Sequence, residues 1–208
     1  MSDIFKTIKS NAEGIYKQKG SKFLSFAIPV QNVDEIKDII SDYRKQFFDA
    51  RHVCYAYMLG FDRKEFRAND DGEPSGTAGR PILGQINSHE LTDVLIIVVR
   101  YFGGVLLGTG GLVSAYKEAA IEALDNAEII EKTVNEQVAI KFDYLLMNDV
   151  MRVIKDLNPQ IISQDFDNEC RMQLLIRKQH ADNLISRLKN ILGLIIDDFT
   201  QNPTARNS

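Results

Sequence analysis

The sequence predicts an α+β protein built from two domains, and three features of the 208-residue chain lead to this prediction. Segments with alternating apolar residues, which are typical of strands, are interspersed with segments whose apolar residues repeat every three or four positions, as in helices. Glycine all but disappears after Leu112 and returns only at Gly193, while a fresh strand-like segment starts near Val134. We therefore place the first domain at residues 1–131, the second at 132–201, and a polar, disordered tail at 202–208.

The first domain is expected to begin with a hairpin and a helix. Residues 14–30 read as two strands around a turn at Gly20 and Ser21. Asn32 stands where a helix cap is needed, and Glu35 follows three residues later, close to the pattern of a capping box. One face of the predicted helix is apolar and carries Ile36, Ile39, Ile40, Tyr43 and Phe47.

The middle of the first domain alternates strands, loops and helices. A strand at residues 53–59 leads to an irregular loop at 69–79, which is rich in Asp, Gly, Pro and Ser. Proline at a first turn indicates a short helix from about residue 81 to 86. Residues 93–101 include six consecutive apolar residues, many of them β-branched, which predicts a strand buried on both faces. A glycine-rich stretch follows, and then a helix from about residue 111 to 126.

The second domain is predicted to be a βαββαβ unit, the ferredoxin-like arrangement. Alternating apolar residues begin near Val138, and a helical stripe follows until Pro159, which ends the helix. Two further strands surround a turn at Asp167 and Asn168. A second helical stripe and a strand at 194–199 complete the unit.

Composition is typical of a soluble globular protein, with 44% hydrophobic and 26% charged residues, and the lack of a signal peptide leads us to expect a cytoplasmic location. The longest apolar run has six residues, whereas a membrane span needs about 20, so no membrane partner is expected. The first residues also lack the apolar stretch of a signal peptide. Cys54 and Cys170 both lie in apolar, strand-like segments, where we expect them to be buried and reduced.

Five glycines within nine residues form the first candidate site. This glycine segment, residues 103–111, lies between the buried strand and a helix. Glycine permits close backbone approach to a ligand, and the free N–H groups of a helix start attract anions. The pattern is neither a Walker A loop nor a G-x-G-x-x-G fingerprint, and close strand–helix packing is an equally good explanation. The candidate anion-binding residues are Arg80, Arg100, Gly103, Gly104, Gly108, Thr109, Gly110 and Gly111.

An acidic loop forms the second candidate site. Its residues are Asp70, Asp71, Gly72, Glu73, Pro74, Ser75, Gly76 and Thr77. Three carboxylates within four residues could hold a divalent ion, but the spacing is not that of an EF-hand and a solvated turn is the commoner outcome, so no metal is predicted. Ser75 and Thr77 could cap the helix that follows. We expect the loop to pack beside the glycine segment and to line the same cleft.

Arg100 is the residue that connects the two candidate sites. It ends the buried strand, where a charge is costly unless it is paired or faces a cleft. One interpretation is an ion pair with Asp70, Asp71 or Glu73. The other is that Arg100 and Arg80 hold a phosphate of RNA or of a nucleotide. The sequence leaves both open.

Catalysis finds little support in the sequence. The only histidines are His52, His89 and His180, and none forms a recognisable Ser–His or Cys–His arrangement. We therefore predict no catalytic residues, no hydrolase triad and no cofactor. The net charge of −4 counts against nucleic-acid binding through bulk charge, so any such contact needs a local basic patch. Three lysines of the first hairpin, at positions 17, 19 and 22, are either a solvated face or an extension of such a patch.

Both candidate sites carry a family resemblance. The segments Asp70–Gly79 (DDGEPSGTAG), Val98–Gly104 (VVRYFGG) and Leu107–Leu112 (LGTGGL) resemble the signature of the Impact/YigZ family. The likeness extends from Gly20 to about Ala123, and the βαββαβ segment is similar to that of bacterial members. The chain departs from the family at Leu106 and Ser114, where a Lys and an Arg often stand, and this removes two cations near the proposed anion site.

The resemblance has implications for fold and function. It implies a first domain similar to the second domain of ribosomal protein S5, and a second domain similar to the last domain of elongation factor G. Eukaryotic relatives are known as translational regulators that act through protein partners. We therefore expect an RNA- or ribosome-associated accessory protein of translation. The alternatives are a protein-interaction module acting on a translation-regulatory protein, and a phosphate-ligand enzyme or sensor, since small-molecule kinases share the S5-like fold.

Overall fold

The computed structural model describes residues 3–167 and 169–197 of the chain. They divide into two compact units, which are described separately here. The N-terminal unit comprises residues 5–132, and the described part of the C-terminal unit comprises residues 3–4, 133–167 and 169–197. The predicted tail at 202–208 lies outside the described residues.

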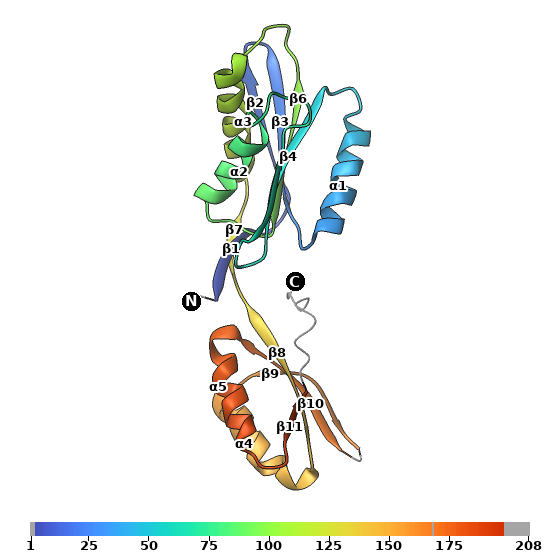
Figure 1. Cartoon of the computed structure of the whole chain (residues 1–208), viewed down its shortest axis with the longest axis vertical. Coiled ribbons are helices and arrows are strands. Elements are labelled where there is room, and N and C mark those ends of the chain that lie inside the picture. Colours follow the sequence, from blue (N-terminus) through green and yellow to red (C-terminus); the bar gives the residue numbers. More distant parts are fainter. Residues whose placement is uncertain (1–2, 168, 198–208) are drawn as a thin grey trace. The chain divides into compact units, whose positions relative to one another are not determined.

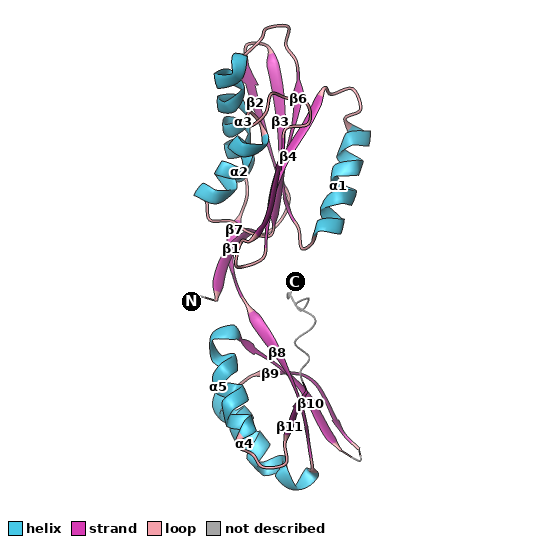
Figure 2. Cartoon of the chain, in the orientation of Figure 1, coloured by secondary structure: helices cyan, strands magenta, loops and turns pink. Residues whose placement is uncertain are grey.

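The N-terminal unit is a five-stranded sheet with helices on both faces. Its elements are β1 (Ile4–Ile8), β2 (Ala12–Gln18), β3 (Ser21–Pro29), α1 (Val33–Gln46), β4 (His52–Leu59), β5 (Glu65–Asn69), α2 (Gly79–Ser88), β6 (Val94–Tyr101), α3 (Gly108–Asp125) and β7 (Ile129–Thr133). The sheet has the order β2-β3-β6-β4-β5, and every neighbouring pair is antiparallel. Helices α2 and α3 cover one face and α1 covers the other (Figures 1 and 2). Strands β1 and β7 pair in a separate two-stranded sheet.

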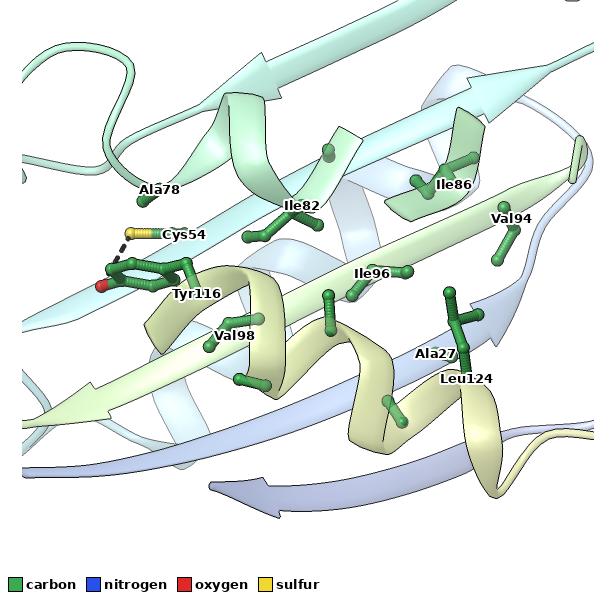
Figure 3. Packing of buried hydrophobic residues seen from close by; sticks show 14 of the residues in the cluster. Ala27, Cys54, Ala78, Ile82, Ile86, Val94, Ile96, Val98, Tyr116 and Leu124 are labelled. Carbon is green, nitrogen blue, oxygen red and sulfur yellow. Dashed lines mark hydrogen bonds between the residues drawn. The ribbon is translucent and has the colours of Figure 1, made fainter. Parts of the chain in front are cut away.

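Strand β6 is the centre of this sheet and is buried on both faces, as predicted. Val94, Ile96 and Val98 belong to the core beneath α2 and α3, whereas the residues that alternate with them belong to the core beneath α1. Figure 3 shows Ile82 of α2 beside Ile96 in the first of these cores. A continuous apolar run is usual in parallel sheets. It occurs in this antiparallel sheet because helices exclude water from both of its faces.

The predicted hairpin and the cap of α1 are both confirmed. Strands β2 and β3 pair on either side of a turn at Lys19 and Gly20, one residue earlier than predicted, because Ser21 already pairs with Gln18 as the first residue of β3. The Asn32 side chain accepts a hydrogen bond from the Glu35 N–H at 2.9 Å. The Glu35 carboxylate in turn accepts from the N–H of Gln31 at 2.7 Å, one residue before the position of a standard capping box.

Two helices begin earlier than predicted. Helix α3 starts at Gly108 instead of about residue 111, so the last four residues of the glycine segment form its first turn. Helix α2 starts at Gly79, two residues before the expected Pro81. Glycine has a low helix propensity, so a helix that begins with glycine is hard to recognise from the sequence. The first turn nevertheless tolerates glycine, because tertiary contacts decide where the helix begins.

The C-terminal unit has the predicted order of elements. They are β8 (Asn135–Phe142), a 3-10 turn η1 (Tyr144–Leu146), α4 (Met147–Leu157), β9 (Gln160–Phe166), β10 (Cys170–Arg177), α5 (Lys178–Lys189) and β11 (Ile195–Asp197). The strands form an antiparallel sheet in the order β11-β8-β10-β9. Half of the predicted turn, Asn168, lies outside the described residues.

Asp3 explains why the first described residues belong to the C-terminal unit. Its buried carboxylate accepts hydrogen bonds from Arg177 at 2.9 Å and from the N–H of Gln179 in the first turn of α5. The Arg177 guanidinium outweighs the effect of burial and lowers the pKa of Asp3. Cys54 and Cys170 are free and buried, as expected. Among the described helices, none is long and apolar enough to cross a bilayer.

Candidate functional site

A buried polar network lies where the two candidate sites meet. The Glu73 carboxylate of the acidic loop accepts a hydrogen bond from Arg100 Nη1 at 2.5 Å and another from the Tyr116 hydroxyl at 2.8 Å. The side chains of Glu73 and Arg100 are only 4% and 7% exposed, so this ion pair is almost entirely shielded from water. His52 Nε2 lies 3.9 Å from the same carboxylate oxygen. The ion-pair interpretation of Arg100 is therefore the one that the structure contains.

Tyr116 and Cys54 continue the network into the core. The Cys54 sulfur lies 3.3 Å from the Tyr116 hydroxyl (Figure 3). It also lies 3.0 Å from the carbonyl oxygen of Asp70. Burial raises the pKa of the Cys54 thiol and that of the Tyr116 phenol, so both stay protonated at neutral pH. A protonated, enclosed thiol is a poor nucleophile. Tyr116 is not recognisable as a site residue from the sequence, because it belongs to the apolar stripe of α3.

The carboxylates of the acidic loop point to different partners. Asp70 bonds to backbone N–H groups at the start of α2. The Asp71 carboxylate accepts from Arg44 at 2.6 Å and from the Val53 N–H at 2.7 Å. Glu73 forms the ion pair with Arg100. Within residues 3–167 and 169–197 no three His, Cys, Asp or Glu side chains gather as metal ligands would. Through these contacts the carboxylates of the loop bind to α1, β4, α2 and β6, and so they have a structural role.

Asp70 replaces the caps that the sequence suggested for α2. Its two carboxylate oxygens accept from the N–H groups of Gly76, Ala78 and Gly79 at 2.8–3.0 Å. The expected cap Thr77 instead donates its hydroxyl proton to the carbonyl of Pro74 at 2.6 Å. Burial alone would raise the pKa of Asp70, but the N–H groups of Gly76, Gly79 and Ala78 outweigh it and lower that pKa.

Replacing Asp70 by alanine is expected to cost about 1–2 kcal/mol of stability at neutral pH, the range for a lost helix cap. Because the folded-state pKa is depressed, this stability is fully present above the unfolded pKa of about 3.9. It is lost as pH falls through the lower, folded-state pKa. Urea denaturation at a series of pH values should therefore show the two proteins converging in acid. Ser75→Ala, at an exposed position of the same loop, is the control and should remain within about 0.5 kcal/mol at every pH. A gap that persists unchanged in acid would exclude the capping role.

Gly103 anchors the glycine segment to the first hairpin. A Cβ atom on Gly103 would overlap the backbone of Gly20 and Ser21. The Gly103 N–H also donates to the Ser21 hydroxyl at 3.2 Å. Close packing is therefore what the first glycine of the segment provides, and the packing is against a hairpin turn.

Three of the four remaining glycines of the segment are open, whereas a Cβ at Gly111 would lie 3.1 Å from the Cβ of Leu107. Gly104 and Gly108 have φ values of +86° and +70°, which favour glycine, and a Cβ at Gly104, Gly108 or Gly110 would meet nothing within 4 Å. Thr109 is exposed as well. Leu107 occupies the cap position of α3 and makes no side-chain hydrogen bond to it. This exposed helix start keeps its N–H groups available to a ligand.

The Gly20–Gly103 contact places a basic hairpin beside the glycine segment. Lys17, Lys19 and Lys22 surround the turn and are exposed, and Lys22 lies opposite Tyr101 at the end of β6. Throughout the described part of the chain, none of the three lysines forms an ion pair with a carboxylate. We call these three residues the lysine hairpin. Three exposed lysines thus gather around one turn in a chain of net charge −4.

The acidic loop reaches the flanks of the glycine segment. Glu73 contacts Arg100, which precedes the glycine segment in the chain, and Tyr116, which follows it in helix α3. A shared cleft between the two loops remains a prediction. Gly72 lies beside the His52 ring and Gly76 beside the exposed Arg80. Within the described residues no histidine is hydrogen-bonded to Ser75 or Thr109. The His52 ring bonds to the Asp71 carbonyl, the His89 ring to the Gln85 carbonyl, and the His180 ring to the Gln179 side chain.

Comparison with known proteins shows similarity over most of the chain. The family model of the Impact N-terminal domain matches residues 19–124, which include the lysine hairpin in part and both loops. The chain is similar to the IMPACT family member YvyE of Bacillus subtilis, at 33% identity over 72% of this chain and 69% of the relative. It is also similar to the IMPACT family member YigZ of Escherichia coli, at 33% identity over 71% and 74% of the two chains.

One solved structure extends the similarity over nearly the whole chain. The crystal structure of a hypothetical protein matches with a TM-score of 0.70 and 26% identity, covering 94% of this chain and 97% of the other. The family model spans half of the chain, and the YvyE and YigZ matches pass well beyond it. The chain therefore belongs to the IMPACT family.

Proposed function

We propose that this protein is an RNA- or ribosome-associated accessory protein of translation that binds the phosphate backbone at the end of its N-terminal unit. The proposal rests chiefly on the lysine hairpin, which the Gly20–Gly103 contact holds against the glycine segment, and the last four residues of that segment form the uncapped start of α3. Cations and free N–H groups on one side of a fold are the usual means of binding phosphate. The translational role of eukaryotic relatives, implied by the family resemblance, points in the same direction.

The proposed site uses the residues predicted from the sequence in two different ways. Exposed Arg80 and the N–H groups of Gly108, Thr109 and Gly110 are available to bind anions directly. Arg100 is 6% exposed and already paired, so we assign it an indirect role in shaping the site. For the fold we propose the S5-like and ferredoxin-like types that the family resemblance implies. The β11-β8-β10-β9 order supports the ferredoxin-like type.

Replacing Lys17, Lys19 and Lys22 together by alanine is expected to weaken RNA binding and to flatten its salt dependence by up to about two units. Each single-strand phosphate contact contributes roughly 0.7 to the slope of log K against log salt. Fluorescence anisotropy of a short labelled RNA over a salt series measures both quantities. The control is the triple alanine variant of Lys37, Lys45 and Lys64, which changes the net charge equally but removes lysines that carboxylates already neutralise.

The outcome separates this proposal from its main alternative. Equal effects of the two triple variants would show that only net charge matters. If the wild type shows no salt-dependent RNA binding at all, a protein-interaction module becomes the better proposal. Leu106 and Val105 favour that alternative, since they are 83% and 52% exposed in the same segment.

A further inference from the structure

We propose that Phe102 is a base-stacking platform, so that the ligand of the lysine hairpin is single-stranded RNA with an unpaired base beside the glycine segment. This inference rests on the proposed function and names its substrate class. Phe102 lies between Tyr101, the last residue of β6, and Gly103, which packs against the turn of the lysine hairpin. A ring at this position is a direct neighbour of the cations that would hold the phosphates.

One face of the Phe102 ring is covered by a cation. The Arg100 guanidinium carbon lies 5.8 Å from the centroid of the Phe102 ring and 5.6 Å from that of Phe23. Phe23 is fully buried, whereas Phe102 is 45% exposed. Arg100 is thus enclosed between a core ring and a surface ring, and the surface ring keeps part of its area open to a ligand.

The buried network holds this arrangement in place. Glu73 bonds to Arg100 at Nη1, and Tyr116 bonds to Glu73, so the guanidinium is tethered from the core. A cation within about 6 Å of an aromatic centroid attracts the ring. Phe102 is therefore restrained before any ligand arrives, which lowers the entropic cost of stacking. This gives the charged signature residues Glu73 and Arg100 a role at the surface although both are buried.

Stacking on one aromatic ring selects for single strands. Bases of a duplex are stacked on each other and paired, so their faces are closed to a protein side chain. Proteins that bind single strands combine a positively charged surface with aromatic rings that accept unpaired bases. The lysine hairpin and Phe102 supply both parts. Phe48, which is 85% exposed, has no cation over its ring within the described residues.

Phe102→Ala in the full-length protein is expected to weaken binding of a short single-stranded RNA about tenfold, with the salt slope unchanged, because stacking releases no counterions. Phe102→Leu should weaken binding similarly, since it keeps an apolar side chain without an aromatic face. Phe48→Ala is the matched control and should bind like the wild type. A duplex of the same sequence should bind equally to wild type and Phe102→Ala.

Phe102→Trp gives a direct optical test. The chain contains no tryptophan, so this variant carries a single indole at the proposed platform. Its fluorescence should be quenched on titration with single-stranded RNA, and its affinity should match that of the wild type. The triple alanine variant of the lysine hairpin, combined with Phe102→Trp, should show the same quenching at higher RNA concentration.

The results distinguish this inference from the proposed function beneath it. Loss of affinity and slope in the lysine variant, with wild-type affinity in Phe102→Ala and Phe102→Leu, overturns the stacking platform and leaves the proposed function standing. Unquenched Phe102→Trp fluorescence at saturating RNA also overturns it. Absence of salt-dependent binding by the wild type overturns both. Should Phe102→Ala fail to fold, the leucine and tryptophan variants decide.

Discussion

Replacing Glu73 by alanine is expected to destabilise the protein by about 3–5 kcal/mol, the cost of breaking a buried ion pair by removing one partner. The variant leaves the Arg100 guanidinium enclosed between two phenylalanine rings without a carboxylate, and it leaves the Tyr116 hydroxyl without its acceptor. Arg100 Nε already lacks a hydrogen-bond partner. The free energy of unfolding from urea denaturation of the full chain measures the effect.

Two further variants show whether the cost arises from the unpaired charge. Lys45→Ala removes an ion pair whose side chains are 73% and 74% exposed, and it should cost less than about 1 kcal/mol. The double variant Glu73→Gln, Arg100→Met should recover a large part of the stability, since it removes the buried charge while keeping an acceptor for Tyr116. If Glu73→Ala costs no more than Lys45→Ala, the network does not stabilise this part of the fold.

Replacing Gly103 by alanine is expected to cost about 3 kcal/mol or more, at the upper end of overpacking effects. The added methyl group would occupy the space of the Gly20 and Ser21 backbone, so the hairpin turn and the glycine segment must separate. Separation moves Lys19 and Lys22 away from the glycine segment. The same variant should therefore bind RNA more weakly, with a flatter salt slope. Urea denaturation and the anisotropy titration measure the two effects.

Gly110→Ala is the matched control within the same segment. Gly110 lies in the first turn of α3 without a positive φ, and an added Cβ would meet nothing within 4 Å. Alanine there should stabilise the protein by about 0.4–1 kcal/mol, because it restricts the unfolded chain. Opposite signs at Gly103 and Gly110 are thus expected. Equal effects at both positions would contradict the packing role assigned to Gly103.

Local sequence determined most of the secondary structure of this protein. The apolar run of β6, the Asn32 cap of α1 and the order of the elements in the C-terminal unit follow from patterns spanning a few residues. The spacing of apolar residues and the capping of helices depend on residues that are close in the chain, so both can be recognised without the tertiary structure. The family signature likewise identified both loops, because it consists of short segments of contiguous residues.

Only the tertiary structure decided what the two loops do. Three carboxylates of the acidic loop were interchangeable in the sequence, and the fold assigned Asp70 to α2, Asp71 to Arg44 and Glu73 to Arg100. The glycines of the glycine segment also looked alike in the sequence. In the fold, Gly103 packs against the turn at Gly20, which lies 83 residues earlier in the chain. Partners so distant in the chain are brought together by the pairing of β3 with β6. Ion pairing, aromatic packing and close backbone approach depend on distances between such partners, and a linear sequence does not contain those distances.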